Sequence, residues 1–204
     1  MRRLLTLIFS LPLFVSASQA QRFGVTVGAN FQRLSDIRLN ALDTKFQDQN
    51  GWHAGVWVEL PIGSFGARVG GRYMAAGQLF DGLQDNFPAV QDSFDVTLAE
   101  VSLLLRYGLR SPLVAPYVFA GPVLRFPFGT GEDISDDLKP LSYAAEIGGG
   151  LEIRLGQLSL YPEVAYVFGM TRFIEDELVL EVITLSVGDP QKLNAALVRL
   201  SVGF

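Results

Sequence analysis

The chain has 204 residues, 49% of them hydrophobic, with a formal net charge of −5, one histidine and no cysteine. This length suits one domain, and the absence of cysteine excludes disulfide bonds, thiolate metal sites and thiol nucleophiles. The acidic pI of about 4.9 and the lack of a basic stripe disfavour nucleic-acid binding.

The first 20 residues predict a secretory signal peptide. Arg2 and Arg3 form a basic start, residues 4–15 are apolar, and Ser18–Ala20 offers small residues for cleavage. The apolar stretch is too short to cross a bilayer as a helix. We therefore expect residues 1–20 to be removed and residues 21–204 to form one exported domain.

Eight later segments alternate apolar residues with small or polar ones, the period of a two-faced β-strand. Their expected ranges are Arg22–Phe31, Gly51–Leu60, Phe65–Ala76, Val96–Leu109, Ala115–Phe126, Leu141–Leu155, Gln157–Phe168 and Leu193–Phe204. The connections alternate between long and short. The long ones are 32–50, 77–95, 127–140 and 169–192, and the short ones are Pro61–Ser64, Arg110–Val114 and Gly156.

This order predicts an all-β fold, an eight-stranded antiparallel up-and-down transmembrane β-barrel. A closed barrel satisfies every backbone hydrogen bond between strands, as a membrane requires. The short turns and both chain ends then share the periplasmic end, the long loops face outside, and the expected location is the cell outer membrane. Pro122 and Pro162 each remove a ladder donor within a strand, so we expect a bulge or kink at both.

The alternation also separates charge from apolar bulk. In the third segment, for example, Arg68 and Arg72 alternate with Val69 and Tyr73. The five strand glutamates share the charged face with seven strand arginines: Glu59, Glu100, Glu146, Glu152, Glu163, Arg22, Arg68, Arg72, Arg106, Arg125, Arg154 and Arg199. Because eight strands leave an interior barely wide enough for side chains, this pattern predicts a plugged lumen of paired ions.

Parity alone does not say which face is outside, since a soluble ligand-binding barrel would turn its polar face outward. Aromatic residues at the strand ends of the apolar face favour the membrane, because such rings form girdles at the two interfaces. They are Phe23, Phe31, Trp52, Phe65, Tyr73, Tyr107, Tyr143, Phe168 and Phe204. In the fifth segment, an inward Arg125 also turns Tyr117 and Phe119 into the lumen.

Three segments resemble PorT-like outer-membrane β-barrel proteins: Pro-Tyr-Val-Phe-Ala-Gly-Pro at 116–122, Gly-Gly-Gly-Leu-Glu at 148–152, and Tyr-Pro-Glu at 161–163 with the aromatic residues that follow. The resemblance covers essentially the whole mature chain. The last strand, apolar at alternating positions and ending in Phe204, looks like the signal read by the barrel-assembly machinery. The resemblance implies insertion by that machinery and, as for some members, a link to secretion or gliding. It implies no catalytic residue.

No constellation of residues predicts a catalytic, cofactor-binding or metal site. His53 is expected to be a polar residue at the lumen rim, since its sequence neighbours supply no nucleophile for a lipid-modifying enzyme. One histidine without cysteine offers no transition-metal site. The run Gly148–Gly150 has no following Lys-Ser/Thr pair, so we expect it to relieve crowding in the lumen rather than to hold phosphate.

The long loops carry 16 of the 21 carboxylates. The densest clusters are Asp81, Asp85, Asp92 and Asp95, and then Glu132, Asp133, Asp136 and Asp137. A solvated surface is the favoured interpretation, because the spacing of a calcium loop is absent; binding of divalent cations, directly or as bridges to lipopolysaccharide, is the alternative. The apolar run within 175–189 predicts a hairpin arm extending the seventh and eighth strands. Its alternative is an exposed edge in 169–192 that recruits a protein by strand addition.

These observations favour a monomeric outer-membrane barrel with a structural, adhesive or machinery-associated role, in contact with outer-membrane lipid and lipopolysaccharide and without chemistry of its own. A small pore or solute conduit is the main alternative. A lipid-modifying enzyme dependent on His53 and a soluble periplasmic ligand-binding barrel are less favoured.

Overall fold

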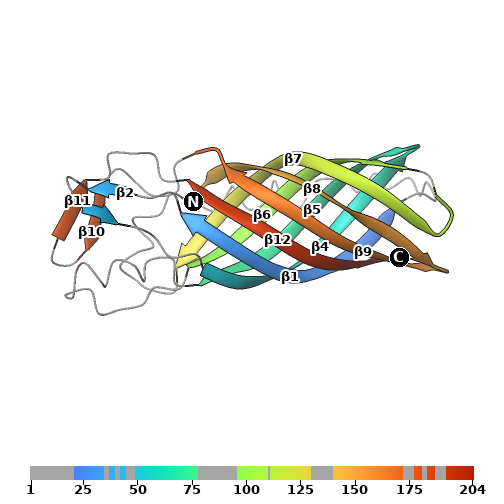
Figure 1. Ribbon diagram of the computed structural model, residues 1–204, viewed down its shortest axis with the longest axis horizontal. Helices are drawn as coiled ribbons and strands as arrows, with labels where there is room; N and C mark the ends of the chain where they lie inside the picture. The colour runs from blue at the N-terminus through green and yellow to red at the C-terminus, as the bar shows by residue number, and fades with distance from the viewer. Residues whose placement is uncertain are drawn as a thin grey trace, which may run out of the picture.

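The computed structural model describes residues 21–34, 37–39, 42–44, 49–77, 96–109, 111–129, 140–171, 177–180, 183–186 and 192–204. Eight antiparallel strands form a closed barrel in the order β1-β12-β9-β8-β7-β6-β5-β4 (Figure 1). They are β1 Arg22–Leu34, β4 Gln49–Ile62, β5 Phe65–Gly77, β6 Val96–Gly108, β7 Val114–Gly129, β8 Ser142–Leu155, β9 Leu158–Gly169 and β12 Leu193–Gly203. The predicted barrel is confirmed, with every strand end within three residues of its expected position. The predicted signal peptide lies outside the described residues.

The first and last strands close the barrel. β1 and β12 pair from Gly24 and Gly203 at one end to Leu34 and Leu193 at the other. Beyond this ladder, Phe23 and Phe204 exchange backbone hydrogen bonds of 3.0 and 2.9 Å. The C-terminal phenylalanine is thus part of the seam, at the end of the barrel that carries the short turns.

Two small hairpins lie within the predicted long loops. β2 (Ile37–Leu39) pairs with β3 (Leu42–Thr44), and β10 (Glu177–Leu180) pairs with β11 (Ile183–Ser186), each as a separate two-stranded sheet. The expected arm is therefore wrong in one respect, because β9 ends at Gly169 and does not continue into β10. The two acidic clusters, at 81–95 and 132–137, lie outside the described residues.

Tight turns connect strands at the end of the barrel where β1 begins and β12 ends. Gly63 and Gly156 each occupy the first position of a two-residue turn with a positive φ, 67° and 68°, a conformation that glycine adopts without steric strain. The first turn is shorter than expected, since Pro61 and Ile62 still belong to β4. We call this the short-turn end of the barrel.

The bulges expected at Pro122 and Pro162 are absent. Next to Pro122, the β6–β7 ladder resumes in the same register after skipping two residue pairs, and the β8–β9 ladder does the same next to Pro162. Each proline stays paired on its other side, Pro122 with Ala145 and Pro162 with Leu200. The missing donor therefore interrupts one ladder without adding a residue. A register shift occurs elsewhere, in β5 between Ala75 and Gly77.

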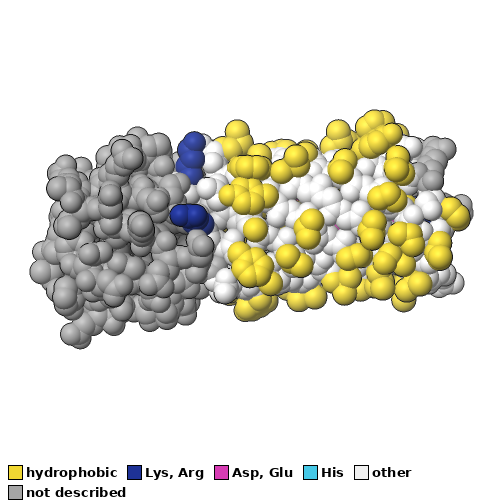
Figure 2. Space-filling model, in the orientation of Figure 1, with side chains coloured by type: hydrophobic (Ala, Val, Ile, Leu, Met, Phe, Trp, Pro, Cys, Tyr) yellow, Lys and Arg dark blue, Asp and Glu magenta, His cyan; other side chains and the backbone are white. Residues whose placement is uncertain are grey.

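The apolar face is outside. In Figure 2 hydrophobic side chains are spread over the outer surface of the barrel, and 34 large apolar residues are exposed in the part of the chain that is described. All nine aromatic residues of the predicted girdles are among them. Soluble monomers rarely expose contiguous apolar patches beyond a few hundred Å², so this surface fits hydrocarbon. Among the described residues no helix is long and apolar enough to cross a membrane.

Site-directed spin labels provide a direct check of this orientation. The chain has no cysteine, so a single introduced cysteine is labelled uniquely. Labels at Val56, Leu151 and Leu200, which are exposed on the outer face, should be relaxed strongly by membrane-dissolved oxygen. A label at Ser201, buried in the lumen, should not. Shielding of the first three labels would mean that the faces are reversed.

Candidate functional site: the charged lumen

The lumen is filled by one unbroken chain of alternating arginine and glutamate. The seven arginines and five glutamates predicted to share the lumen face all form ion pairs with one another. From the short-turn end, the order is Arg22 and Arg154, Glu152, Arg106, Glu59, Arg68, Glu163, Arg199, Glu146, Arg72, Glu100 and Arg125. The predicted inward pairing is confirmed.

Glu152 and Glu59 anchor the chain at the short-turn end. Glu152 accepts hydrogen bonds from Arg22 at 2.9 Å, from Arg154 at 2.8 Å and from Arg106. Arg106 also donates to Glu59 at 2.7 Å. Arg68 donates to the second oxygen of Glu59 at 2.9 Å. Both carboxylates therefore use both of their oxygens.

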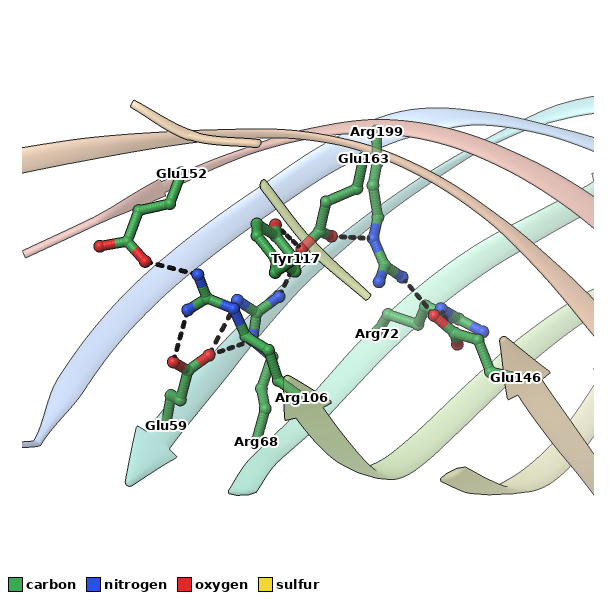
Figure 3. Close-up of polar contacts among 9 residues, drawn as sticks. All are labelled: Glu59, Arg68, Arg72, Arg106, Tyr117, Glu146, Glu152, Glu163 and Arg199. Atoms are coloured by element: carbon green, nitrogen blue, oxygen red, sulfur yellow. Dashed lines mark hydrogen bonds and ion pairs between the residues drawn. The ribbon is translucent and has the colours of Figure 1, made fainter. Parts of the chain in front are cut away.

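Glu163 joins the two halves of the chain in the middle of the lumen (Figure 3). It accepts from Arg68 at 2.6 Å and also from Arg199 and from the hydroxyl of Tyr117. Tyr117 is inward, as the facing of Arg125 requires. Three polar groups from three different strands thus converge on one carboxylate.

Aromatic rings cover the guanidinium planes at this level. The guanidinium carbon of Arg68 lies 4.3 Å from the centre of the Trp57 ring, and that of Arg106 lies 3.8 Å from the centre of Tyr117. Arg199 lies over Phe119 at 5.1 Å. Such cation–π contacts stabilise a desolvated cation by about 2 kcal/mol. They offset part of the desolvation of the buried arginines.

The other half of the chain runs toward the long loops. Glu146 lies 2.8 Å from both Arg199 and Arg72. Arg72 also pairs with Glu100, and Glu100 accepts from Arg125 at 2.6 Å. Arg125 then donates to the backbone carbonyl of Leu193 at 2.6 Å, from β7 to β12. This last contact fastens the end of the chain to a strand that β7 does not pair with.

The strand register explains some of these contacts. Glu59 and Arg68, Arg72 and Glu100, Glu100 and Arg125, and Arg199 and Glu163 are direct cross-strand neighbours. Neighbours on one face of a sheet lie about 4.5–5.5 Å apart. Apart from Arg154 and Glu152, which share β8, the remaining pairs cross the lumen between strands that do not pair, as from Arg68 on β5 to Glu163 on β9. Ion pairs therefore tie separate walls of the barrel together.

His53 lies deeper than expected. It is fully buried within the lumen rather than at its rim, close to Gly28 of the neighbouring strand β1, where an added Cβ would lie 2.7 Å from the ring. We expected His53 at the rim because it lies two residues after the predicted strand start, Gly51. In the structure β4 begins at Gln49, two residues earlier. In the part of the chain that is described, neither ring nitrogen has a hydrogen-bond partner.

The glycine run has the expected structural role. A Cβ at Gly148 would lie 2.4 Å from the Phe119 ring, and one at Gly150 would lie 2.9 Å from the Glu163 side chain. Both positions face the lumen, so the absence of side chains makes room for the chain of ions. Within the described ranges, no group of three or more His, Cys, Asp or Glu residues could hold a metal ion.

Besides Tyr117 and Phe119, which were expected to point inward, further aromatic and amide groups are buried beside the ions. Trp57 and Tyr161 pack edge to face at 5.4 Å beside the ions, and Asn30 and Gln32 are buried near the long-loop end of the lumen. Parity places all four on the lumen face: Asn30 and Gln32 with Arg22, Trp57 with Glu59, and Tyr161 with Glu163. Charge alone does not mark such uncharged positions.

Comparisons with known proteins agree with this architecture. No protein-family model matches the chain, and no curated protein sequence matches it. Neisserial surface protein A (NspA) is 12% identical, with 89% of this chain and 95% of that chain covered and a TM-score of 0.57. A major outer membrane protein of Thermus thermophilus is 19% identical, with 91% and 100% covered and a TM-score of 0.50. The chain has the fold of small outer-membrane β-barrels. With the apolar outer surface, this fold supports the predicted outer-membrane location.

Proposed function

We propose that this protein is an integral outer-membrane barrel with a closed lumen, acting through its surfaces in a structural, adhesive or machinery-associated role. The observation that carries the proposal is the unbroken chain of ion pairs from Arg22 to Arg125. To open a path for solutes, the barrel would have to separate buried ions that stabilise one another. Breaking a buried pair costs about 3–5 kcal/mol, so spontaneous opening is rare.

The same proposal includes membership of the PorT-like family, insertion by the barrel-assembly machinery through the strand ending at Phe204, contact with lipopolysaccharide, and a monomeric state. It also includes the absence of catalysis. A histidine that activates a nucleophile lies within hydrogen-bond reach of that nucleophile, and the ring of His53 makes no such bond among the described residues. A secretion-linked role would place the partner at the long-loop end, for which the 169–192 segment is the candidate.

Planar-bilayer recording tests the closed lumen. The refolded protein should give no stable single-channel steps, while a porin inserted in the same bilayers gives its usual conductance. Protease protection of the inserted barrel would show that insertion took place. Reproducible unitary steps from the wild-type chain would overturn the proposal and support a small solute conduit instead.

A further inference from the structure

A small polar cavity opens at the short-turn end of the lumen. Its volume is about 60 Å³, and the charged residues that line it are Arg22, Arg106, Arg154, Glu59 and Glu152. One water molecule requires only about 10–15 Å³ of such a cavity. The space is therefore large enough for a small molecule or for the end group of a larger one.

The cavity carries more donors than acceptors. Three guanidinium groups line it against two carboxylates, and one of these carboxylates, Glu59, also pairs with Arg68 outside the cavity. All four carboxylate oxygens already accept hydrogen bonds from arginines. Each guanidinium has five N–H donors and no acceptor. The cavity therefore has more positive than negative charge and more N–H donors than acceptor oxygens.

One of these donors is buried without a partner. Arg106 is 6% exposed, and its Nε has no hydrogen-bond partner in the described structure. A buried donor left unpaired is unfavourable, and an arginine cannot remove it by losing a proton. A water oxygen or an anion within hydrogen-bond distance of Nε would satisfy this group.

The other two arginines keep the cavity open to solvent. The side chains of Arg22 and Arg154 are 34% and 39% exposed, whereas the arginines farther along the lumen are nearly fully buried. The short-turn end faces the periplasm in an outer-membrane barrel. A ligand can thus reach the cavity from that side without separating the rest of the ion chain.

We propose that this cavity binds an oxyanion, a carboxylate or phosphate group, held between Arg22, Arg154 and Arg106. Planar guanidinium groups match such anions with paired, charge-assisted hydrogen bonds. The two sources of this chemistry are a free anion of the periplasm and the phosphate of a lipid headgroup in the adjacent leaflet. The site does not require a conducting lumen, because the cavity lies at the short-turn end, where the ion chain begins.

Isothermal titration of the refolded barrel in zwitterionic detergent tests the site, with sodium phosphate and sodium acetate as probes and sodium chloride at matched ionic strength as reference. At least one oxyanion should bind saturably at a stoichiometry of one. Arg154→Gln and Arg22→Gln should each weaken binding at least tenfold, and both residues are exposed enough for the fold to survive. Arg33→Gln, an exposed arginine at the opposite end of the barrel, should leave binding unchanged.

Nanodiscs distinguish the two sources. Phosphate binding is compared in two kinds of disc: discs that contain phosphatidylglycerol, and zwitterionic discs whose lipid is too short to reach the mouth. If the ligand is a lipid phosphate, phosphatidylglycerol should occupy the cavity and lower the binding of added phosphate in the first kind. If it is a free anion, the two kinds of disc should give equal binding, and either result supports the site. Heat no larger than that of chloride for both oxyanions would overturn the proposal. Equal affinity of Arg154→Gln, Arg22→Gln and wild type would also overturn it.

Discussion

Replacing Glu100 with alanine should lower the free energy of unfolding by about 3–5 kcal/mol, the usual loss when one partner of a buried ion pair is removed. Arg125 is 1% exposed, and Glu100 is the carboxylate with which it pairs. Without Glu100, Arg125 keeps only the carbonyl of Leu193 among its described partners. Urea unfolding in lipid vesicles, followed by tryptophan fluorescence, measures the loss, and the gel mobility of the folded form provides a second readout.

Glu152→Ala is the matched control, since it removes a glutamate from the same chain at its open end. Arg22 and Arg154 are partly exposed there, and Arg106 keeps Glu59. Glu152 is itself buried, but water or Glu59 remains for its partners, so the expected loss is smaller than for Glu100→Ala, about 1–3 kcal/mol. The double variant Glu100→Ala with Arg125→Met should recover most of the stability, because it removes the stranded charge. Equal losses for Glu100→Ala and Glu152→Ala would show that the burial of the arginines left behind does not set the size of the loss.

The sequence was sufficient to predict the barrel, because a period of two survives along every strand. Apolar residues must alternate with inward residues when one face meets lipid, and a shift by a single residue would reverse every side chain. Arg68, Arg72 and Glu59 therefore revealed their facing without any knowledge of the neighbouring strands. The same reasoning placed Tyr117 and Phe119 correctly once Arg125 was taken as inward.

The partners of each ion could be predicted only in part. Pairs between adjacent strands, such as Arg72 with Glu100, follow from register. Pairs across the lumen, such as Arg72 with Glu146, depend on the tilt and stagger with which the sheet closes. Local sequence carries no record of that closure. The sequence therefore predicted that the ions pair, but not that they form one continuous chain.

The prolines show where local rules lose to the closed sheet. Pro122 was expected to distort its strand, because a missing donor weakens a ladder. In the barrel, β7 is held by β8 on the other side of Pro122 and keeps its register with β6. Neighbouring Gly121 lets the two strands approach, since a Cβ there would lie 2.0 Å from the Leu103 carbonyl oxygen. The lost hydrogen bond is tolerated where the rest of the sheet determines the geometry.

Replacing Val198 with arginine should destabilise the inserted barrel by about 2–4 kcal/mol, the cost of an arginine on the lipid face near the bilayer midplane. Val198 lies midway along β12, is 53% exposed and has Val164 and Ala29 as cross-strand neighbours. Because its side chain is on the outer face, the new charge would lie in hydrocarbon. Urea unfolding from vesicles measures the change, with Val198→Leu as the variant that keeps the surface apolar.

Leu113→Arg provides the depth control for this experiment. Leu113 is also an exposed apolar residue, but it lies in the connection before β7 at the short-turn end, where an arginine reaches the headgroups. The expected cost there is about 0–1 kcal/mol. In a bilayer the loss of stability should be larger for Val198→Arg than for Leu113→Arg. If both positions faced water, the two losses would be similar. If Val198→Arg left stability unchanged, the exposed apolar belt would not be a lipid-facing surface, and the orientation on which the closed lumen depends would be wrong.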